Sequence, residues 1–352
     1  MNNRRNTIIF LFSIHACLAL FGYTIFSSAA EQKPVALPVF ELALPKDLPN
    51  PHSPFWIGPD KVGFVAEREV KGELEGALYR YELATKTVLK LLDRAVSYPT
   101  FLPDKQRISF VAVGKAQTLA LFTMSPTGRE IKEYDLDGAI VFSPSWSPDR
   151  GKVVFAGNSY DAEIGIFNFQ TGVGEGLGDV GRGRETSGTD APDWSPNGRE
   201  IVYVGWDKSS RIVDDGYDPK ISRLYVMDLR TRIYRRLTSG SFQDRWPAYS
   251  PDGRYIAFVS NRSKVFELWM MNRDGTNLRK LTDMAKRGLQ VTGEKPAWSP
   301  DQRKISFAVI PSTEKPHTGG FPFGGSRVWI LEGLRGSGSA GAQGQSGAQG
   351  QA

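Results

Sequence analysis

The sequence predicts an all-β fold, a six-bladed β-propeller of four-stranded antiparallel blades. A short phrase recurs six times, in which Pro-Asp or Pro-Asn is followed by an apolar run. The prolines stand at positions 59, 103, 148, 196, 251 and 300, so the steps are 44, 45, 48, 55 and 49 residues. A repeat of that length indicates one supersecondary unit copied along the chain. No long helical stripe follows residue 30, which excludes a helical solenoid, and a two-sheet sandwich does not predict a six-fold phrase.

The first element of each repeat is a short apolar strand that ends in an aromatic residue and leads into a tight turn. The turn is clearest at Ser250–Gly253, where Pro presets φ, Asp bonds its own backbone and Gly accepts a positive φ. We interpret the aromatic residues as fillers between blades rather than as a platform for carbohydrate. They are Phe101, Trp146, Trp194, Tyr249 and Trp298.

The remaining strands of a blade follow in order. The second is an apolar stretch such as Ile256–Phe258, whose β-branched and aromatic ends alternate with a period of two. The third, such as Leu268–Met271, follows a loop of variable length, and a turn at Arg273–Gly275 leads to the fourth, Leu278–Thr282. Four strands in about 45 residues make the blade of a propeller, as in WD-like repeats.

Three blades are expected to depart from this pattern. In blade one the phrase Trp56–Pro59 is one residue out of step, and in blade three the glycine-rich stretch Gly172–Gly183 stands where a fourth strand should lie. In blade six, residues 332–335 lead straight into a Gly/Ser/Ala/Gln tail, so the fourth strand is missing. We therefore predict that the alternating segment Pro38–Leu44 pairs with blade six and closes the ring, which removes an exposed sheet edge.

The repeats resemble those of a known family. Residues 247–262 read Pro-Ala-Tyr-Ser-Pro-Asp-Gly-Arg-Tyr-Ile-Ala-Phe-Val-Ser-Asn-Arg, and residues 267–282 read Glu-Leu-Trp-Met-Met-Asn-Arg-Asp-Gly-Thr-Asn-Leu-Arg-Lys-Leu-Thr. Both are similar to the TolB-like propeller repeat, whose family builds six-bladed propellers. The resemblance covers about residues 38–334 and is specific in blades four to six. TolB carries an α/β domain ahead of its blades, whereas about twenty residues separate the hydrophobic leader from blade one here, so we do not assign the Tol–Pal role.

The chain is expected to consist of three parts. Residues 1–30 carry two arginines, an apolar run over residues 7–26 and then Ser-Ala-Ala, which is the order of a secretory signal. The apolar run is also long enough to span a bilayer, so the leader is either a cleaved signal peptide or an uncleaved membrane anchor. Both alternatives place the propeller, residues 31–335, in the periplasm or outside the cell, in contact with a membrane only through residues 7–26 if they are retained. Residues 336–352 contain only Gly, Ser, Ala and Gln, and we expect them to be disordered.

The positions of cysteine and of charged residues argue against a disulfide and against a nucleic-acid partner. The single cysteine, Cys17, lies in the leader, where His15 fits a lipoprotein signal badly, so the mature chain is expected to have no disulfide. Removing residues 1–30 takes away two arginines and no acid, so the net charge falls from +6 to +4. Basic and acidic residues alternate along the blades without a basic block, which argues against a nucleic-acid partner and favours a solvated mixed surface.

The motif search predicts that the chain is not an enzyme. Peptidases such as those of the prolyl oligopeptidase and dipeptidyl peptidase families pair a similar propeller with a hydrolase domain, which needs Gly-x-Ser-x-Gly, and that motif is absent here. His15, His52 and His317 form no cluster of metal-ligand spacing, and no phosphate or dinucleotide motif occurs, so we predict no metal and no cofactor. The acidic loop over residues 214–218 is interpreted as a solvated loop rather than a calcium site.

Loop lengths predict where a ligand binds. The loops between strands one and two, and between strands three and four, are short, and they should all emerge on one face. The long segments, over residues 67–76, 172–190, 206–222, 284–295 and 311–326, should emerge on the other face, where irregular loops tend to carry binding residues. The residues just before each inner-strand proline should ring the channel mouth there, either binding a ligand or pairing between blades. We predict binding at the mouth by Asp190, Asp244, Arg245, Trp246, Glu294 and Lys295, with His52 and Ser53 as the less certain pair of blade one, and binding in the loops by Tyr217, Phe321 and Phe323.

These observations predict a monomeric, non-catalytic binding or scaffold propeller of the cell envelope, which presents its loop-rich face to a protein or peptide. The alternative is a glycan-binding propeller, with or without weak lyase or hydrolase activity. Aromatic side chains beside paired carboxylates at the channel mouth would favour the glycan. An apolar patch around Phe321 and Phe323, ringed by polar loops, would favour the protein partner.

Overall fold

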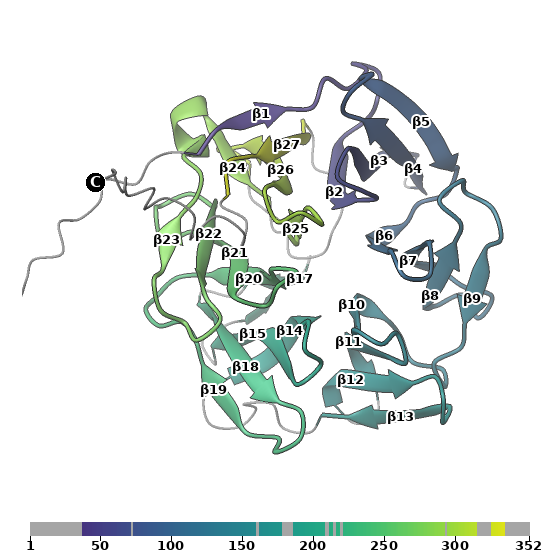
Figure 1. Cartoon of the computed structure of the whole chain (residues 1–352), viewed down its shortest axis with the longest axis vertical. Helices are drawn as coiled ribbons and strands as arrows, with labels where there is room; N and C mark the ends of the chain where they lie inside the picture. Colours follow the sequence, from purple (N-terminus) through teal and green to yellow (C-terminus); the bar gives the residue numbers. More distant parts are fainter. Residues whose placement is uncertain are drawn as a thin grey trace, which may run out of the picture. The chain divides into compact units, whose positions relative to one another are not determined.

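The computed structural model of the chain describes residues 37–71, 73–159, 162–177, 186–207, 211–213, 216–218, 221–292, 294–314 and 325–334. Within these ranges six antiparallel sheets are arranged in a ring, one sheet per repeat, and the predicted six-bladed propeller is confirmed (Figure 1). The predicted leader, the tail, Phe321 and Phe323 lie outside the described residues, as does the side chain of Tyr217.

Each blade consists of consecutive strands, the innermost first. Blade one comprises β2 (Pro51–Trp56), β3 (Lys61–Val70), β4 (Glu73–Glu82) and β5 (Thr87–Leu92). Blade two comprises β6 (Ser97–Leu102), β7 (Arg107–Val113), β8 (Leu119–Met124) and β9 (Lys132–Tyr134). Blade three comprises β10 (Phe142–Trp146), β11 (Lys152–Ser159), β12 (Ala162–Asn168) and β13 (Val173–Gly176).

The second half of the ring is less regular. Blade four comprises β14 (Thr186–Trp194), β15 (Glu200–Asp207), β18 (Ser222–Asp228) and β19 (Tyr234–Arg236), with a separate hairpin of β16 (Arg211–Val213) and β17 (Gly216–Asp218). Blade five comprises β20 (Asp244–Tyr249), β21 (Tyr255–Ser260), β22 (Glu267–Asn272) and β23 (Arg279–Lys280). Blade six follows a 3₁₀ turn at Met284–Arg287 and comprises β24 (Leu289–Val291), β25 (Ala297–Trp298), β26 (Ile305–Pro311), β27 (Arg327–Leu331) and β1 (Val39–Glu41).

One prediction about blade three is wrong. The stretch Gly172–Gly183 was expected to lack a fourth strand, yet β13 pairs with β12 from Gly165↔Gly176 to Asn168↔Val173. A strand at this position needs backbone groups more than side chains, because its hydrogen bonds come from the main chain and its outer side faces solvent. Val173 is accordingly 60% exposed. The glycines weaken the sequence pattern of the strand but do not prevent the pairing.

The Pro-Asp phrase owes its recurrence to a compact turn. In blade five the Ser250 hydroxyl donates to Asp252 Oδ1 at 2.7 Å and accepts from the backbone N–H of Tyr255 at 2.9 Å. The same Asp252 oxygen accepts from the N–H of Arg254 at 3.1 Å, and Gly253 has a φ of 70°. A side chain at Gly253 would also come within 3.4 Å of Pro196 in the preceding blade. Serine and the acid therefore supply the hydrogen bonds of this turn, and glycine suits its left-handed position, which Arg150 and Gln302 occupy in blades three and six.

The innermost strands share a bulge that sets the shape of the channel. In five blades the residue before the inner-strand proline has a left-handed backbone, and the pairing to the second strand shifts register there. Blade six differs, because its inner strand is interrupted between β24 and β25 and Lys295 has no positive φ. The five left-handed residues are Ser53, Tyr98, Ser143, Ala191 and Trp246, with φ of 46°, 52°, 46°, 48° and 55°.

The core lies between adjacent blades, as the sequence predicts for its aromatic residues. Between blades four and five, for example, Val202 and Leu224 pack against Trp246, Tyr249 and Phe258. Hydrogen bonds complete these contacts, since the indole N–H groups that enter a seam need acceptors. The indole of Trp146 donates to Ser109 of blade two at 2.9 Å, and that of Trp56 donates to the carbonyl of Ala297 in blade six at 3.0 Å.

The predicted closure of the ring by the N-terminal segment is confirmed. Strand β1 pairs antiparallel with β27, with Val39 opposite Leu331 and Glu41 opposite Trp329. The ladder continues beyond the strand, where the Leu42 N–H donates to the carbonyl of Val328 at 2.9 Å. Leu42 itself is 4% exposed and packs with residues of blades six and one.

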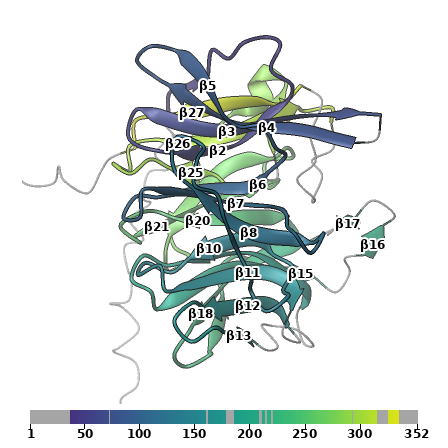
Figure 2. The ribbon, with the colours of Figure 1, turned by 90° about the vertical axis from the view of Figure 1, so that its right-hand side faces the viewer.

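Two of the connections that the sequence predicts to be long lie on one face of the ring. The extended β3–β4 hairpin and the β16–β17 hairpin project on the same side of the ring, at the right of Figure 2. We call this the loop-bearing face, and we call the opposite side, with the Pro-Asp turns, the short-turn face. Within the part of the chain that the structure describes, no helix is long and apolar enough to cross a membrane.

We predict that closure depends on Leu42. Leu42→Ala should lower the free energy of unfolding by about 2–5 kcal/mol, because it leaves a cavity in the seam between blades six and one. Phe40→Ala, on the same segment but 37% exposed, should cost roughly 1 kcal/mol or less. Urea denaturation of both variants measures the difference, and equal losses would contradict a role of Leu42 in this seam.

Candidate functional site

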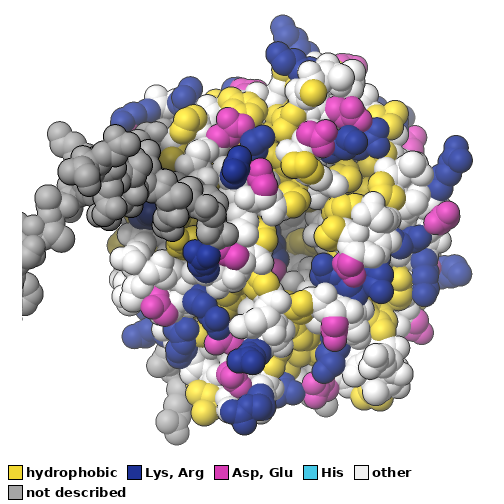
Figure 3. Space-filling view, viewed as in Figure 1, with side chains coloured by type: hydrophobic (Ala, Val, Ile, Leu, Met, Phe, Trp, Pro, Cys, Tyr) yellow, Lys and Arg dark blue, Asp and Glu magenta, His cyan; other side chains and the backbone are white. Residues whose placement is uncertain are grey.

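A central cavity of about 820 Å³ lies within the ring and is lined by the innermost strands of all six blades. All six turn prolines contribute to its lining, which places one end at the short-turn face, where a hollow is visible (Figure 3). Its other end, toward the loop-bearing face, is lined by the beginnings of the inner strands, including His52, Tyr98, Trp246 and Glu294. The walls are thus largely apolar, with His52, Glu294 and Lys295 toward the loop-bearing face and Arg150 toward the short-turn face.

A buried histidine joins blade one to blade six at this end. His52 Nδ1 lies 2.9 Å from Glu294 Oε1, and His52 Nε2 lies 3.4 Å from Glu67 Oε2. The second oxygen of Glu294 accepts from the backbone N–H of Ser53 at 2.6 Å. Burial acts to lower the pKa of His52, but the two carboxylates outweigh it and raise that pKa to about 10. His52 is therefore an imidazolium cation held between two acids at neutral pH.

A second ion pair joins blades that are not neighbours. Lys295 of blade six pairs through its ammonium group with Asp193 Oδ1 of blade four. The same carboxylate accepts from the Ser145 hydroxyl of blade three at 2.9 Å and from the Tyr249 N–H of blade five at 2.8 Å. One carboxylate thus links four blades beside the cavity, and its 8% exposure indicates that it is shielded from bulk water.

A third group of side chains surrounds Asp190. Its carboxylate accepts from the N–H of Ala191 at 2.5 Å. Burial raises the pKa of Asp190 to about 6, although the Ala191 N–H and the nearby Arg245 oppose that rise. Tyr98 and Trp246 form a tilted aromatic pair nearby, with ring centroids 6.2 Å apart. Tyr98 and Trp246 line the end of the cavity toward the loop-bearing face and lie near a buried carboxyl group whose pKa is raised to about 6.

The structure brings together half of the residues that the sequence singled out at the mouth. Trp246, Glu294 and Lys295 line the central cavity. Asp190 and Arg245 do not line it, and Arg245 is 5% exposed, with its guanidinium over the ring of Phe266. The prediction that these residues bind a ligand stays a prediction.

Asp244 lies inside blade five rather than on the cavity wall. Its two carboxylate oxygens accept from the guanidinium of Arg262 at 2.6 and 2.7 Å, and the Ser260 hydroxyl donates to it at 2.6 Å. With 1% exposure, Asp244 has the contacts of an ion pair within one blade. The sequence left open whether the charged residues at the mouth bind a ligand or pair between blades. In the structure, Asp244 pairs with Arg262 of its own blade.

Sequence reasoning missed Asp193 and the partner of His52. Asp193 follows the inner-strand proline, where the other blades have Phe55, Thr100, Ser145, Ala248 and Ala297, so a charge at this repeat position was a usable signal. Glu67 was grouped with a long loop, whereas it belongs to β3 and is 2% exposed. Its contact with His52 depends on the register between β2 and β3, which the sequence does not specify.

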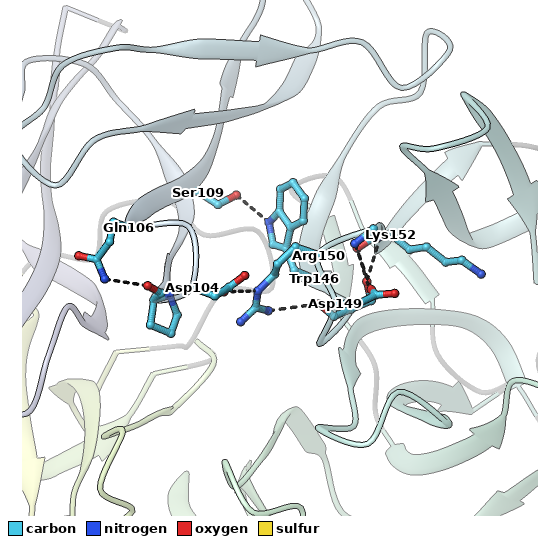
Figure 4. A network of polar contacts seen from close by, with 10 residues as sticks. Asp104, Gln106, Ser109, Trp146, Asp149, Arg150 and Lys152 are labelled. Carbon is cyan, nitrogen blue, oxygen red and sulfur yellow. Dashed lines mark hydrogen bonds and ion pairs between the residues drawn. The ribbon is translucent and has the colours of Figure 1, made fainter.

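The short-turn end of the cavity has its own polar network (Figure 4). The Arg150 guanidinium of blade three donates to Asp104 of blade two at 2.8 Å, and Gln106 donates to the carbonyl of Pro103 at 2.7 Å. The first contact joins the turns of blades two and three, and the second lies within the turn of blade two. Among the residues that the structure describes, no group of three or more His, Cys, Asp or Glu side chains is arranged to hold a metal ion.

Comparisons with known proteins support the fold. No family model matches the sequence. A stretch of 92 residues is 36% identical to an uncharacterized protein of Agrobacterium fabrum, covering 26% of this chain and 28% of that protein. A stretch of 119 residues is 33% identical to the uncharacterized peptidase YuxL of Bacillus subtilis, and it covers 34% of this chain and 17% of that protein. A stretch of 93 residues is 34% identical to the Tol-Pal system protein TolB of Anaeromyxobacter sp. strain K, covering 26% and 18%. The chain thus spans less than a third of each of these relatives.

Two solved structures have a similar fold. The putative TolB from Agrobacterium tumefaciens superposes with a TM-score of 0.55 at 18% identity, over 84% of this chain and 96% of that one. TolB from Acinetobacter baumannii superposes with a TM-score of 0.51 at 17% identity, over 74% of this chain and 60% of that one. The resemblance to TolB-like propellers that the repeats predict is confirmed at the level of the fold.

We predict that His52 stays protonated through neutral pH. Its contribution to stability should be complete below about pH 6.5 and should disappear as pH rises toward 10, because its pKa is higher in the folded chain than in the unfolded chain. The histidine NMR signal that His52→Gln removes should therefore not shift between pH 6 and 8. The Glu67→Gln, Glu294→Gln double variant removes both carboxylates, so burial alone acts on the imidazole and the pKa of His52 should fall below 6.5. A signal that titrates near 6.5 in the wild-type chain would contradict this assignment.

We also predict an asymmetric response of the Asp193–Lys295 pair. Asp193→Ala should lower the free energy of unfolding by about 3 kcal/mol, since it leaves Lys295 and two buried donors without their acceptor. Lys295→Ala should cost about 1 kcal/mol, because the lysine side chain is 37% exposed. Chemical denaturation of the two variants tests this order, and a larger loss for Lys295→Ala would show that the lysine is the stabilising partner.

Proposed function

We propose that this chain is an exported, non-catalytic binding propeller of the cell envelope that holds a protein or peptide segment at the loop-bearing end of its central cavity. The observation that carries the proposal is the cavity itself, whose apolar walls end in charged groups contributed by several blades. Convergent polar groups at the end of a concave apolar site are the usual arrangement of a binding site. Export rests on the order of charged, apolar and small residues in the leader.

The chemistry of the cavity suits a peptide. Its walls offer prolines and the aromatic rings of Tyr98 and Trp246, which pack against side chains at low entropic cost. Lys295 is 37% exposed and Glu294 is 11% exposed, so both lie at the border between the buried network and solvent. A peptide can pair with charges of either sign there. The similarity to a protein named for the Tol-Pal system supports a binding role, although it covers 18% of that relative.

A glycan-binding propeller is the second candidate, and a specific observation favours it. Tyr98 and Trp246 form their aromatic pair beside Asp190, and the charge of Glu294 also acts on Tyr98. Aromatic faces beside carboxylates are also a surface on which sugars bind. This candidate leaves room for weak lyase or hydrolase activity, and the likeness of a 119-residue stretch to an uncharacterized peptidase points to relatives with catalytic domains.

Site-specific photo-crosslinking distinguishes these candidates. A benzophenone amino acid replacing Lys295 should crosslink a defined envelope protein, because position 295 lines the central cavity. The matched control replaces Ile233, which is 70% exposed on the outer edge of blade four and should give no such product. Circular dichroism checks that both variants are folded.

The outcome of the crosslinking decides between partner classes. Identical products from positions 295 and 233, or no protein product from position 295, would contradict the proposed peptide site. Titration of neutral and acidic oligosaccharides into the chain, followed by tryptophan fluorescence, then tests the glycan candidate. Quenching that is lost in Trp246→Leu, in a variant that still folds, would support it.

A further inference from the structure

A second cavity, of about 680 Å³, opens between blades three and four toward the short-turn face. We call it the seam cavity. Lys152 at the start of β11, Arg199 in the Pro-Asn turn, and Arg230 and Arg232 in the turn between β18 and β19 contribute to its lining. Apolar side chains complete it, namely Ile166, Trp194 and Leu229. Apart from Trp194, its lining residues differ from those of the central cavity.

The seam cavity has more positive than negative groups. Four cations face two carboxylates, and both carboxylates already have partners. Glu175 pairs with Arg232 at 3.2 Å. Asp228 Oδ1 accepts from the backbone N–H groups of Arg230 and Thr231, at 3.0 and 2.7 Å. Within the described ranges, Lys152, Arg199 and the guanidinium of Arg230 have no carboxylate within ion-pair distance.

Among the described residues, the equivalent position forms an ion pair in blades two, four and six but not in blade three. At the start of the second strand, Arg107 of blade two pairs with Glu130 at 3.2 Å and Lys304 of blade six pairs with Glu332 at 3.5 Å. In blade four the same position is Glu200, which pairs with Arg273 of blade five at 2.6 Å. In blade three it is Lys152, whose ammonium extends away from the turn and contacts none of the other residues drawn as sticks in Figure 4.

The seam between blades three and four also lacks a hydrogen bond that the preceding seam has. The indole of Trp146 donates to Ser109 in the second strand of blade two. The corresponding tryptophan of blade four is Trp194, and the corresponding residue of blade three is Val154, which offers no acceptor. Among the described residues the Trp194 indole N–H has no partner. The Trp194 side chain that lacks this acceptor is part of the lining of the seam cavity.

We propose that the seam cavity binds an organic oxyanion, a ligand that carries two or more phosphate or carboxylate groups. Guanidinium groups bind both kinds of oxyanion through paired N–H donors, and a lysine adds a mobile positive charge. Arg199, Arg230 and Lys152 would contact the charged groups, while Ile166, Trp194 and Leu229 hold the carbon skeleton. The site does not depend on the function proposed for the central cavity.

Isothermal titration calorimetry with two simple probes tests the proposal. Inorganic pyrophosphate and citrate are titrated separately into the full chain at fixed low ionic strength, with sodium chloride as the reference salt. Binding of one or both is expected. Arg199→Gln and Arg230→Gln should each weaken that binding roughly tenfold, the size of one charge-assisted contact. The control is Arg303→Gln, which changes the equivalent turn position of blade six and should leave affinity unchanged.

Each result has a defined meaning. Binding of pyrophosphate but not citrate supports a phosphate ligand, and the reverse supports a carboxylate ligand. Failure of both probes to bind, or equal weakening by Arg303→Gln, overturns the proposal, the latter because it indicates general attraction to a positive surface. Thermal unfolding of the three variants, which change exposed side chains, verifies that each remains folded.

Discussion

The structure depends on the requirement that every blade bury both faces against neighbouring blades. A ring meets this requirement only when its last seam is closed, and here β1 closes it by pairing with β27. Three further contacts lie in or beside the same seam: the packing of Leu42, the hydrogen bond from Trp56 to Ala297 and the ion pair between His52 and Glu294. Strand β1 belongs to the sheet of blade six and continues along the chain into β2 of blade one, and these non-covalent contacts reinforce that connection.

The closing blade is also where the symmetry of the ring breaks. Five inner strands contain a left-handed residue before proline, but that of blade six is interrupted between β24 and β25. The interruption changes the path of the residues that include Glu294 and Lys295, which reach across to blades one and four. An irregularity in one copy of a repeat can thus place charged groups where a perfectly repeated strand would place none. This strand and Asp193 of blade four both contribute to the asymmetry of the central cavity.

The two faces differ in what they can recognise. On the loop-bearing face, charged groups lie at the end of an apolar cavity and are buried in networks, so their protonation and packing are coupled. On the short-turn face, the turns satisfy their own polar groups, and most surface charges of opposite sign lie close together (Figure 3). The seam between blades three and four is an exception, because Lys152, Arg199 and Arg230 line its cavity without an ion-pair partner among the described residues.

The sequence by itself determined the fold, because each blade is specified by local chemistry: a Pro-Asp or Pro-Asn turn, alternating apolar strands and an aromatic residue at the seam. It also predicted the pairing of residues 38–44 with blade six and the placement of Trp246, Glu294 and Lys295 beside the cavity. Tertiary structure decided which of the charges face one another. Asp244 pairs with Arg262, Asp193 links four blades, and β13 pairs with β12 although it contains glycines. These outcomes depend on strand register and on the distance between blades, and contacts between residues as far apart as Asp193 and Lys295 leave no local pattern in the sequence.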